Sequence, residues 1–234
     1  MADTAPFSLD SASLPLRNLP SGSYLVHATN CIATWGAGIA AEMADIFPAA
    51  CREYKRFCIE EGGSSDNGTK DGDDPSRRQQ QQQRRRWPTR SPIGGRCLVI
   101  PPQDADVRAG APRVHIVCLF TSSGYGRADP ARGKPGRDAP ARILEQTASS
   151  LRAFRAALAE TPAPTVKKTK AEAGAGVREA TADINAADGR AVIYSPMFNS
   201  GAFKVPWDKT EALIRDEFRD WPGRWAVLAP PRSG

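Results

Sequence analysis

The chain has 234 residues, a net charge of +6 and a hydrophobic fraction of 40%. A hydrophobic content below the usual roughly 45–50% indicates that part of the chain lies outside a packed core, and the apolar segments that remain fit a single domain. No apolar run reaches the roughly 20 residues of a membrane span, and the N-terminus lacks the basic and apolar regions of a signal peptide. We therefore expect an intracellular protein, cytoplasmic or nuclear, without a membrane partner.

The cysteines and histidines argue against a disulfide framework and against a metal centre. The chain has five scattered cysteines without a Cys-x-x-Cys pair, and only two histidines. An odd number of cysteines at irregular spacing is not typical of a secreted disulfide scaffold, and zinc sites need closely spaced ligands. We predict no metal and no cofactor.

The first stretch with a clear pattern is a strand, a glycine-rich turn and a helix. Before it, at most a short edge strand is expected around 13–18. The run Tyr24–Val26 is apolar with a β-branched residue, which predicts a buried strand. Gly36 and Gly38 fall in the turn, and apolar residues then recur at helical spacing from Ile39. This arrangement can hold a phosphate at the helix N-terminus, although it is also compatible with a plain tight connection.

Helical spacing continues to Cys58, and Pro48 should kink the helix or begin a second one. The segment 61–95 then has the composition of disorder, with a glutamine run from Gln79 to Gln83 and clustered arginines. We interpret it as a disordered insertion. Its arginines are compatible with a solvated loop or with a contact to nucleic acid.

Two further apolar runs, Arg96–Ile100 and Val114–Phe120, predict buried strands. The clearest helix of the chain is predicted over Ala141–Leu158, with Pro140 suitably placed at its start. The Ala-, Thr- and Lys-rich segment 161–189 contains few apolar residues and is interpreted as a second disordered insertion.

The C-terminal part repeats the alternation. A strand is predicted over Ala191–Tyr194, a helix from Trp207 and a last strand over Arg224–Leu228. Strands that alternate with helices indicate an α/β layered sheet, in which ligands bind at the carboxyl ends of the strands.

Loops rich in small residues leave the carboxyl ends of the predicted strands: Ala28–Gly38, Thr121–Gly126 and Ser195–Phe203. Loops at one end of such a sheet converge on one crevice, so these loops are candidates for a shared site. Backbone N–H groups of Asn199–Phe203 suit an anion, and Phe203 suits either a sugar contact or the core.

Two side chains beside the glycine turn are candidates for chemistry. His27 is either a core histidine or a group that exchanges a proton, and Asn30 can orient a hydroxyl or a water. His115 lies among apolar residues and is expected to be structural, and Cys31 is expected to be a buried, inert thiol.

Together these residues resemble the macrodomain family, and most closely its yeast-type ADP-ribose 1''-phosphate phosphatase branch. The similarity rests on motifs that occur in the same order as in the family. They are His27-Ala-Thr-Asn30-Cys31 followed by Trp35-Gly36-Ala37-Gly38-Ile39-Ala40, the helix break Phe47-Pro48, Cys118-Leu-Phe-Thr-Ser122-Ser123, and Asn199-Ser200-Gly201-Ala202-Phe203 with Pro206-Trp207 and Thr210-Glu211. Lys204 departs from the glycine of many relatives.

The resemblance implies a three-layer α/β/α macrodomain with a central mixed sheet, spanning 1–234 as one domain. It implies that Asn30 contacts the terminal ribose, and that His27 affects turnover. The residues implied to bind the ligand are Trp35, Gly36, Ala37, Gly38, Ile39, Ser122, Ser123, Asn199, Ser200, Gly201, Ala202 and Phe203.

The activity implied is hydrolysis of ADP-ribose 1''-phosphate to ADP-ribose and phosphate, by a monomeric hydrolase of ADP-ribosylation metabolism. The alternatives are removal of mono-ADP-ribose from proteins and a non-catalytic ADP-ribose reader. The partners expected are thus ADP-ribose, ADP-ribose 1''-phosphate or ADP-ribosylated protein, with nucleic acid as a further partner of the Arg-rich segment.

Overall fold

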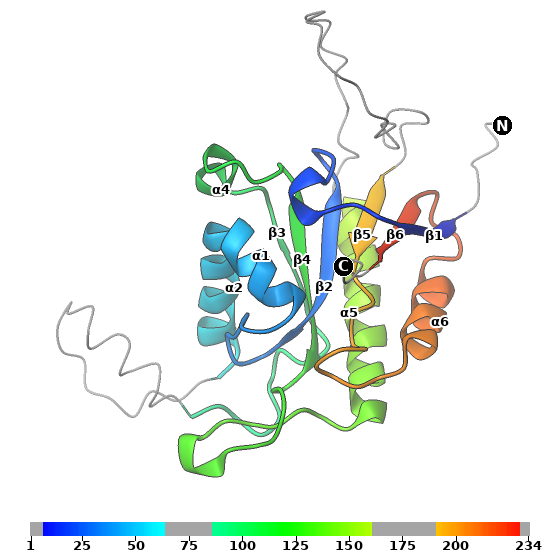
Figure 1. Cartoon of the computed structure of the whole chain (residues 1–234). Helices are drawn as coiled ribbons and strands as arrows, with labels where there is room; N and C mark the ends of the chain where they lie inside the picture. The colour runs from blue at the N-terminus through cyan, green and yellow to red at the C-terminus, as the bar shows by residue number, and fades with distance from the viewer. Residues whose placement is uncertain (1–6, 64–85, 161–190, 230–234) are drawn as a thin grey trace, which may run out of the picture.

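The computed structural model describes residues 7–63, 86–160 and 191–229 (Figure 1). Its centre is a six-stranded sheet with the order β1-β6-β5-β2-β4-β3. The only antiparallel pair among these strands is β3 with β4; the other neighbours are parallel. The strands are β1 (Ser8–Ala12), β2 (Tyr24–Asn30), β3 (Cys97–Ile100), β4 (His115–Ser122), β5 (Val192–Ser195) and β6 (Arg224–Leu228).

Helices cover both faces of the sheet, which is seen nearly edge-on in Figure 1. One face carries α1 (Ile39–Ile46) and α2 (Pro48–Glu61), and the other carries α5 (Pro140–Glu160) and α6 (Trp207–Glu217). A short helix, α4 (Asp104–Arg108), lies beside α2. The expected α/β/α layers around a mixed sheet are confirmed.

The two faces of the sheet form separate cores because successive side chains of a strand point to opposite sides. On β2, Leu25 packs with α1 and α2, whereas Tyr24 and Val26 pack with α5 and α6. All of them are at most 4% exposed, so β2 is buried on both faces and fixes the middle of the fold.

The helix break predicted at Pro48 is confirmed, and the structure shows what stabilises it. Pro48 is the first residue of α2, where its missing N–H costs nothing. The buried carboxylate of Asp106 accepts hydrogen bonds from the N–H groups of Ala49 at 2.7 Å and Ala50 at 3.0 Å. Helix α4, which the sequence pattern did not reveal, thus supplies a cap for α2.

The edge strand expected around 13–18 is wrong in position. The strand is Ser8–Ala12, and Leu16–Asn18 forms a 3-10 turn. The polar sequence of β1 has no strand signature of its own. Its strand conformation comes from parallel pairing with β6, in which Ser8 lies opposite Arg224.

The insertions expected at 61–95 and 161–189 lie largely outside the described residues. The end of the first one is ordered, in contrast to the expectation. Ile93 is fully buried, and the N–H of Gly95 donates to the carbonyl of Phe120 at 2.8 Å. Ile93 is a single large apolar residue among glycines and prolines, so it gives no periodic signal in the sequence. The hydrogen bond of Gly95 attaches this stretch to β4. None of the helices within the described ranges is long and apolar enough to cross a membrane.

Candidate functional site

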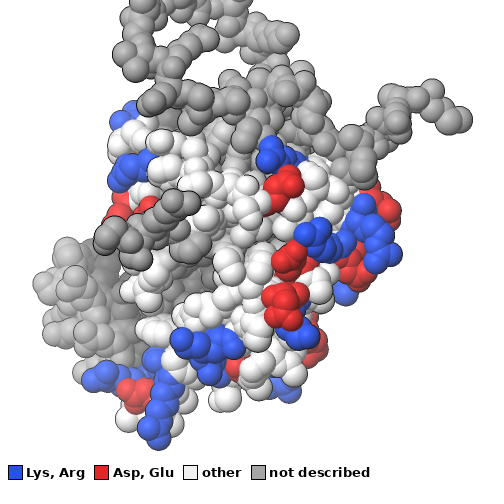
Figure 2. Space-filling view, turned by 45° about the vertical axis from the view of Figure 1, so that its right-hand side comes forward, with Lys and Arg blue, Asp and Glu red and all other residues white. Residues whose placement is uncertain are grey.

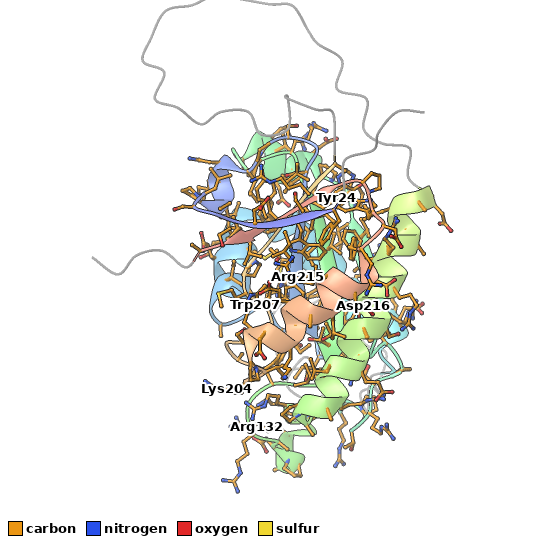
Figure 3. All side chains as sticks on the ribbon, turned by 90° about the vertical axis from the view of Figure 1, so that its right-hand side faces the viewer. Tyr24, Arg132, Lys204, Trp207, Arg215 and Asp216 are labelled. Carbon is orange, nitrogen blue, oxygen red and sulfur yellow. The ribbon has the colours of Figure 1, made fainter. Side chains whose placement is uncertain are left out.

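A cavity of about 380 Å³ lies at the carboxyl ends of β2 and β5. The loop between β2 and α1 and the loop between β5 and α6 form its two sides. Figure 3 shows Lys204, from the second loop, at the opposite end of the molecule from Tyr24, the first residue of β2. The lining includes the sequence-predicted residues His27, Asn30, Trp35, Gly36, Ala37, Gly38, Ile39, Asn199, Gly201, Ala202 and Phe203.

The first loop presents a row of backbone donors to the cavity. Within the described part of the chain, none of the N–H groups from Trp35 to Ala40 donates to a protein acceptor. Ile39 begins α1, so the positive end of the helix dipole lies at the same place. The run therefore has the properties of an anion cradle.

The conformation of this loop depends on Gly38. Its φ is 55° and its ψ is −141°, a combination that side chains with a Cβ disfavour. A Cβ added there would meet nothing within 4 Å, so the constraint comes from the backbone and not from crowding.

The side chain of Asn30 holds the loop from inside. Its Oδ1 accepts from the N–H groups of Ile32 at 3.1 Å and Thr34 at 3.3 Å, and its Nδ2 donates to the carbonyl of Thr34 at 2.7 Å. Asn30 is only 7% exposed. We expected Asn30 to contact the ribose. Its side-chain amide instead forms hydrogen bonds with the backbone of its own loop.

Tyr54 of α2 completes this network. Its hydroxyl donates to the carbonyl of Asn30 at 2.8 Å, lies 3.0 Å from Asn30 Oδ1, and accepts from Thr34 N–H at 3.2 Å. The ring is fully buried and stacks on Trp35 at 5.0 Å. Burial raises the pKa of the phenol well above its usual value, so the hydroxyl keeps its proton.

His27 lies beneath Trp35 at the base of the cavity. It is 1% exposed, its ring meets Trp35 edge-on at 4.8 Å, and its Nε2 is 3.8 Å from the sulfur of Cys118. Nδ1 is buried and has no hydrogen-bond partner among the residues that the structure describes. Burial lowers the pKa of the imidazole to about 3, so it is neutral at physiological pH and a weak proton acceptor.

The second loop is anchored by Asn199, whose φ of 67° lies in the left-handed region that asparagine tolerates. Its amide accepts from Thr121 at 2.9 Å and donates to Thr147 at 2.9 Å and, at 3.4 Å, to Thr210. The side chain is therefore occupied by three threonines. What Asn199 gives the site is the shape of the loop.

Beyond this anchor the loop offers a second row of donors. Among the described residues, the N–H groups of Gly201, Ala202 and Phe203 have no protein acceptor. Phe203 lines the cavity and also packs with Ile143, so one side chain belongs both to the cavity wall and to the core. Lys204 has a φ of 57°, in the left-handed region that glycine adopts more easily than residues with a Cβ.

Ser122 and Ser123 do not line the cavity, in contrast to the expectation, and neither does Ser200. Ser122, the last residue of β4, and the following Ser123 bind Asp138 instead. The carboxylate of Asp138 accepts from the N–H and hydroxyl of Ser123 at 2.8 and 3.0 Å, and its own N–H donates to Ser122 Oγ at 3.0 Å. Their sequence position at the end of β4 was right, but their side chains fasten the following loop.

Several lining residues were not singled out from the sequence, notably Thr34, Tyr125 and Met197. Met197 is 40% exposed, which is unusual for a large apolar side chain in this protein. Only their place in the predicted loops could have indicated them. None of the described lining residues carries a formal charge, so the polar character of the cavity comes mainly from amide groups.

The remaining candidates from the sequence are structural. His115 stacks on Tyr24 at 4.9 Å, and burial lowers the pKa of its imidazole. Cys31 is buried, and burial raises the pKa of its thiol to about 12, which makes it inert. No cluster of metal-ligating side chains occurs in the ranges described.

Known proteins similar to this chain point to one family. No family model matches the chain. An ADP-ribose 1''-phosphate phosphatase of Aspergillus clavatus is 30% identical over 234 residues, covering 94% of this chain and 92% of that protein. A protein of the same name from Aspergillus fumigatus is 30% identical, covering 86% of each chain. One from the yeast Meyerozyma guilliermondii is 27% identical, covering 83% and 84%.

Solved structures agree on the fold. The macrodomain of Mycobacterium tuberculosis DarG superposes with a TM-score of 0.54 at 16% identity, covering 95% of this chain and 97% of its own. Thermosipho africanus DarTG, solved in complex with ADP-ribose, gives 0.52 at 10% identity, covering 97% of this chain and 43% of its own. Taken with the fungal relatives, which match 83–94% of its length, this fold makes the chain a member of the macrodomain family, in the branch of the ADP-ribose 1''-phosphate phosphatases.

Proposed function

We propose that the cavity binds ADP-ribose and that the protein hydrolyses ADP-ribose 1''-phosphate to ADP-ribose and inorganic phosphate. The observation that carries the proposal is the pair of unpaired N–H rows, Trp35–Ala40 and Gly201–Phe203, on opposite sides of one cavity. The fungal relatives carry this activity in their names, and the DarTG neighbour was solved with ADP-ribose.

The chemistry of the lining suits a diphosphate. Backbone N–H groups at fixed positions stabilise negative charge without the cost of reorienting water, and they act strongly in a cavity from which water is excluded. The two rows would each take one side of the diphosphate, which leaves the terminal ribose between Asn30 and Phe203. The 1''-phosphate on that ribose then meets the same donors.

The reaction is hydrolysis of the phosphate ester on the terminal ribose. The ester bond breaks, water supplies a proton to one product and a hydroxyl to the other, and ADP-ribose and inorganic phosphate leave. Asn30 acts as a positioning residue that keeps the first row of donors in place. His27, neutral and with a buried Nδ1 that lacks a partner, is suited to a hydrogen bond with the substrate or the water more than to proton abstraction. Of the described lining residues none is a carboxylate, so the cavity contributes positioning and charge stabilisation.

Two other functions fit the same cavity. Removal of mono-ADP-ribose from protein side chains would use the same ribose position. A non-catalytic reader of ADP-ribose would use the same donors without turnover, and the amide of Asn30, occupied by its own loop, favours this alternative more than the sequence suggested.

The test is to incubate the purified protein with ADP-ribose 1''-phosphate and with mono-ADP-ribosylated protein, and to measure ADP-ribose binding by calorimetry in parallel. Release of phosphate from the nucleotide supports the proposal. Turnover of the protein substrate alone supports the second function. Tight binding without either reaction leaves the reader, and absence of binding contradicts all of them.

A matched pair of glycine variants connects the result to the cavity. Gly38→Ala should weaken ADP-ribose binding about fivefold or more, because the positive-φ backbone that forms the first donor row disfavours alanine by about 1–3 kcal/mol. Gly22→Ala is the control: its φ is 84°, and open space surrounds its Cβ position, but it lies before β2 and away from the cavity. Equal effects of the two variants on binding would show that the loop conformation at Gly38 is not what holds the ligand.

A further inference from the structure

A second, open cleft of about 620 Å³ lies next to the cavity and belongs to a different part of the chain. The loop between β4 and α5, residues 124–139, forms most of it, and the ordered end of the first insertion closes one side. Its lining residues are Arg86, Trp87, Thr89, Gly126, Arg127, Ala128, Pro130, Gly133, Lys134, Pro135, Gly136, Arg137 and Asp138. We refer to it as the basic cleft.

The charges of the basic cleft are almost all positive. Across the described residues, no carboxylate lies within 4 Å of the cationic groups of Arg127, Lys134 or Arg137. The one acidic lining residue, Asp138, is turned toward β4 and α5, where its carboxylate accepts from Ser123 and from Gln146 at 2.9 Å. Arg127, Lys134 and Arg137 thus give the cleft positive charge that no carboxylate of the described residues pairs with.

Positive side chains also gather at one end of the molecular surface. In Figure 2, blue side chains gather on the lower part of the molecule with few red ones among them, whereas red and blue alternate on the right. Figure 3 places Arg132 from this loop at the same end of the molecule as Lys204. A net charge of +6 alone does not require the positive side chains to lie together at one end of the molecule.

The backbone of the cleft is fixed by hydrogen bonds. Asp129 and Lys134 exchange N–H···O bonds of 2.9 Å, and the N–H of Arg137 donates to the carbonyl of Gly126 at 2.9 Å. Lys134 donates to the carbonyl of Arg127 at 3.0 Å, with its ammonium 4.3 Å from the ring centre of Tyr125. The cationic side chains therefore project from a loop whose backbone is fixed by hydrogen bonds.

An aromatic ring closes the same cleft. Trp87 lines the cleft and is half-buried because it also packs against the core that α1 and α2 cover. Its backbone N–H donates to the carbonyl of Gly133 at 3.0 Å, which joins the two sides of the cleft. A groove of cations with an aromatic side chain suits a nucleic-acid strand, because the cations pair with phosphates and the ring stacks on bases. A single phosphate would need neither the volume nor the ring.

We propose that the basic cleft binds single-stranded nucleic acid, with Arg127, Lys134 and Arg137 on its phosphates and Trp87 against a base. The cleft adjoins the cavity, since Tyr125 lines the cavity and Arg137 donates to the carbonyl of Ala202 at 3.4 Å. The proposal rests on the residues of the cleft and holds whatever the cavity turns over.

The experiment measures fluorescence anisotropy of a labelled oligothymidylate of about 12 nucleotides, a length within the usual site sizes of about 4–16. The triple variant Arg127→Ala, Lys134→Ala and Arg137→Ala should bind roughly tenfold weaker or worse at moderate salt. The dependence of log affinity on log salt should become shallower by about 2, because each lost contact to a single strand removes about 0.7.

The control removes the same charge elsewhere. The triple variant Arg56→Ala, Arg215→Ala and Arg219→Ala loses exposed ion pairs on α2 and α6 and should keep the affinity and salt dependence of the parent. Both triple variants should show the cooperative urea unfolding of the parent, which shows that they are folded. Equal losses in the two variants would mean that only net charge matters and would overturn the proposal.

Two further probes test the class of ligand. An abasic oligonucleotide of the same length should bind several-fold weaker, since it offers phosphates without bases for Trp87. Equal affinity of the abasic strand, tighter binding of a phosphopeptide, or full displacement by millimolar inorganic phosphate would contradict a nucleic-acid site. A chain lacking 64–85 should retain binding; loss there, with no effect of the cleft variant, would also overturn the proposal.

Discussion

At the scale of single residues, His27 decides how the protein should respond to acid. Its imidazole has a pKa of about 3 in the folded chain against 6.5 for the ordinary group, because burial opposes the charged form. Between pH 6.5 and pH 3, His27 is therefore protonated in the unfolded chain and neutral in the folded chain. The stability that neutral burial allows is complete above pH 6.5 and is lost as the pH falls from 6.5 toward 3.

This gives a prediction for unfolding measured by urea titration. Between pH 6 and pH 4, the contribution of His27 should lower the free energy of unfolding by up to about 1.4 kcal/mol for each pH unit. The variant His27→Gln should show a shallower acid slope than the parent, while other titrating groups affect both proteins alike. Parallel curves for the two proteins would show that His27 is accessible to protons in the folded state.

Sequence reasoning at this scale succeeded for backbone chemistry and failed for side-chain direction. Gly38 and Asn30 could be recognised because a glycine turn before a helix and a polar residue after a strand are local patterns. Whether Ser122 points to the cavity or to Asp138 depends on a loop folding back over β4, and no local pattern contains that information. The reach of Tyr54 from α2 into the first loop was hidden for the same reason.

At the scale of elements, α2 holds the binding loop through one hydroxyl. Tyr54→Phe removes that hydroxyl and leaves the ring stacked on Trp35. We expect the free energy of unfolding to fall by about 1–2 kcal/mol, since buried partners lose a hydrogen bond. The Kd for ADP-ribose should also rise several-fold, because Asn30 and Thr34 lose a shared anchor.

The control for this prediction is Tyr24→Phe. It makes the same chemical change at the first residue of β2, at the opposite end of that strand from Asn30. It should leave ADP-ribose binding unaltered. If Tyr54→Phe lowers stability but not affinity, the hydroxyl stabilises only the core, and the prediction that it positions the loop is wrong.

The elements themselves were largely predictable, and the reason is burial. Strands such as β2 and β4 are covered on both faces and contain continuous apolar runs, and α5 shows a clear helical spacing. β1 lies at the edge of the sheet and its polar residues have no such pattern. Its position depends on β6, more than 200 residues later in the numbering, as the pairing of Ser8 with Arg224 shows.

At the scale of the whole molecule, the described parts are sufficient for the proposed cavity. The ends of the first undescribed segment lie close together: a Cβ at Gly62 would be 3.4 Å from the ring of Trp87, and one at Gly63 would be 3.6 Å from Pro92. Replacing 64–85 by a short Gly-Ser linker should therefore keep the fold. ADP-ribose affinity should change less than twofold by calorimetry, and a large loss would place part of the binding site in that segment.

The anion cradles have a consequence for how this protein can vary. Their donors belong to the main chain, so exchanging Ala37 or Ala202 for another small residue removes none of them. Side-chain identity in these loops is therefore a poor measure of whether a relative retains anion binding. The backbone angles at Gly38 and Asn199 are a better one, because they decide where every donor of the two rows points.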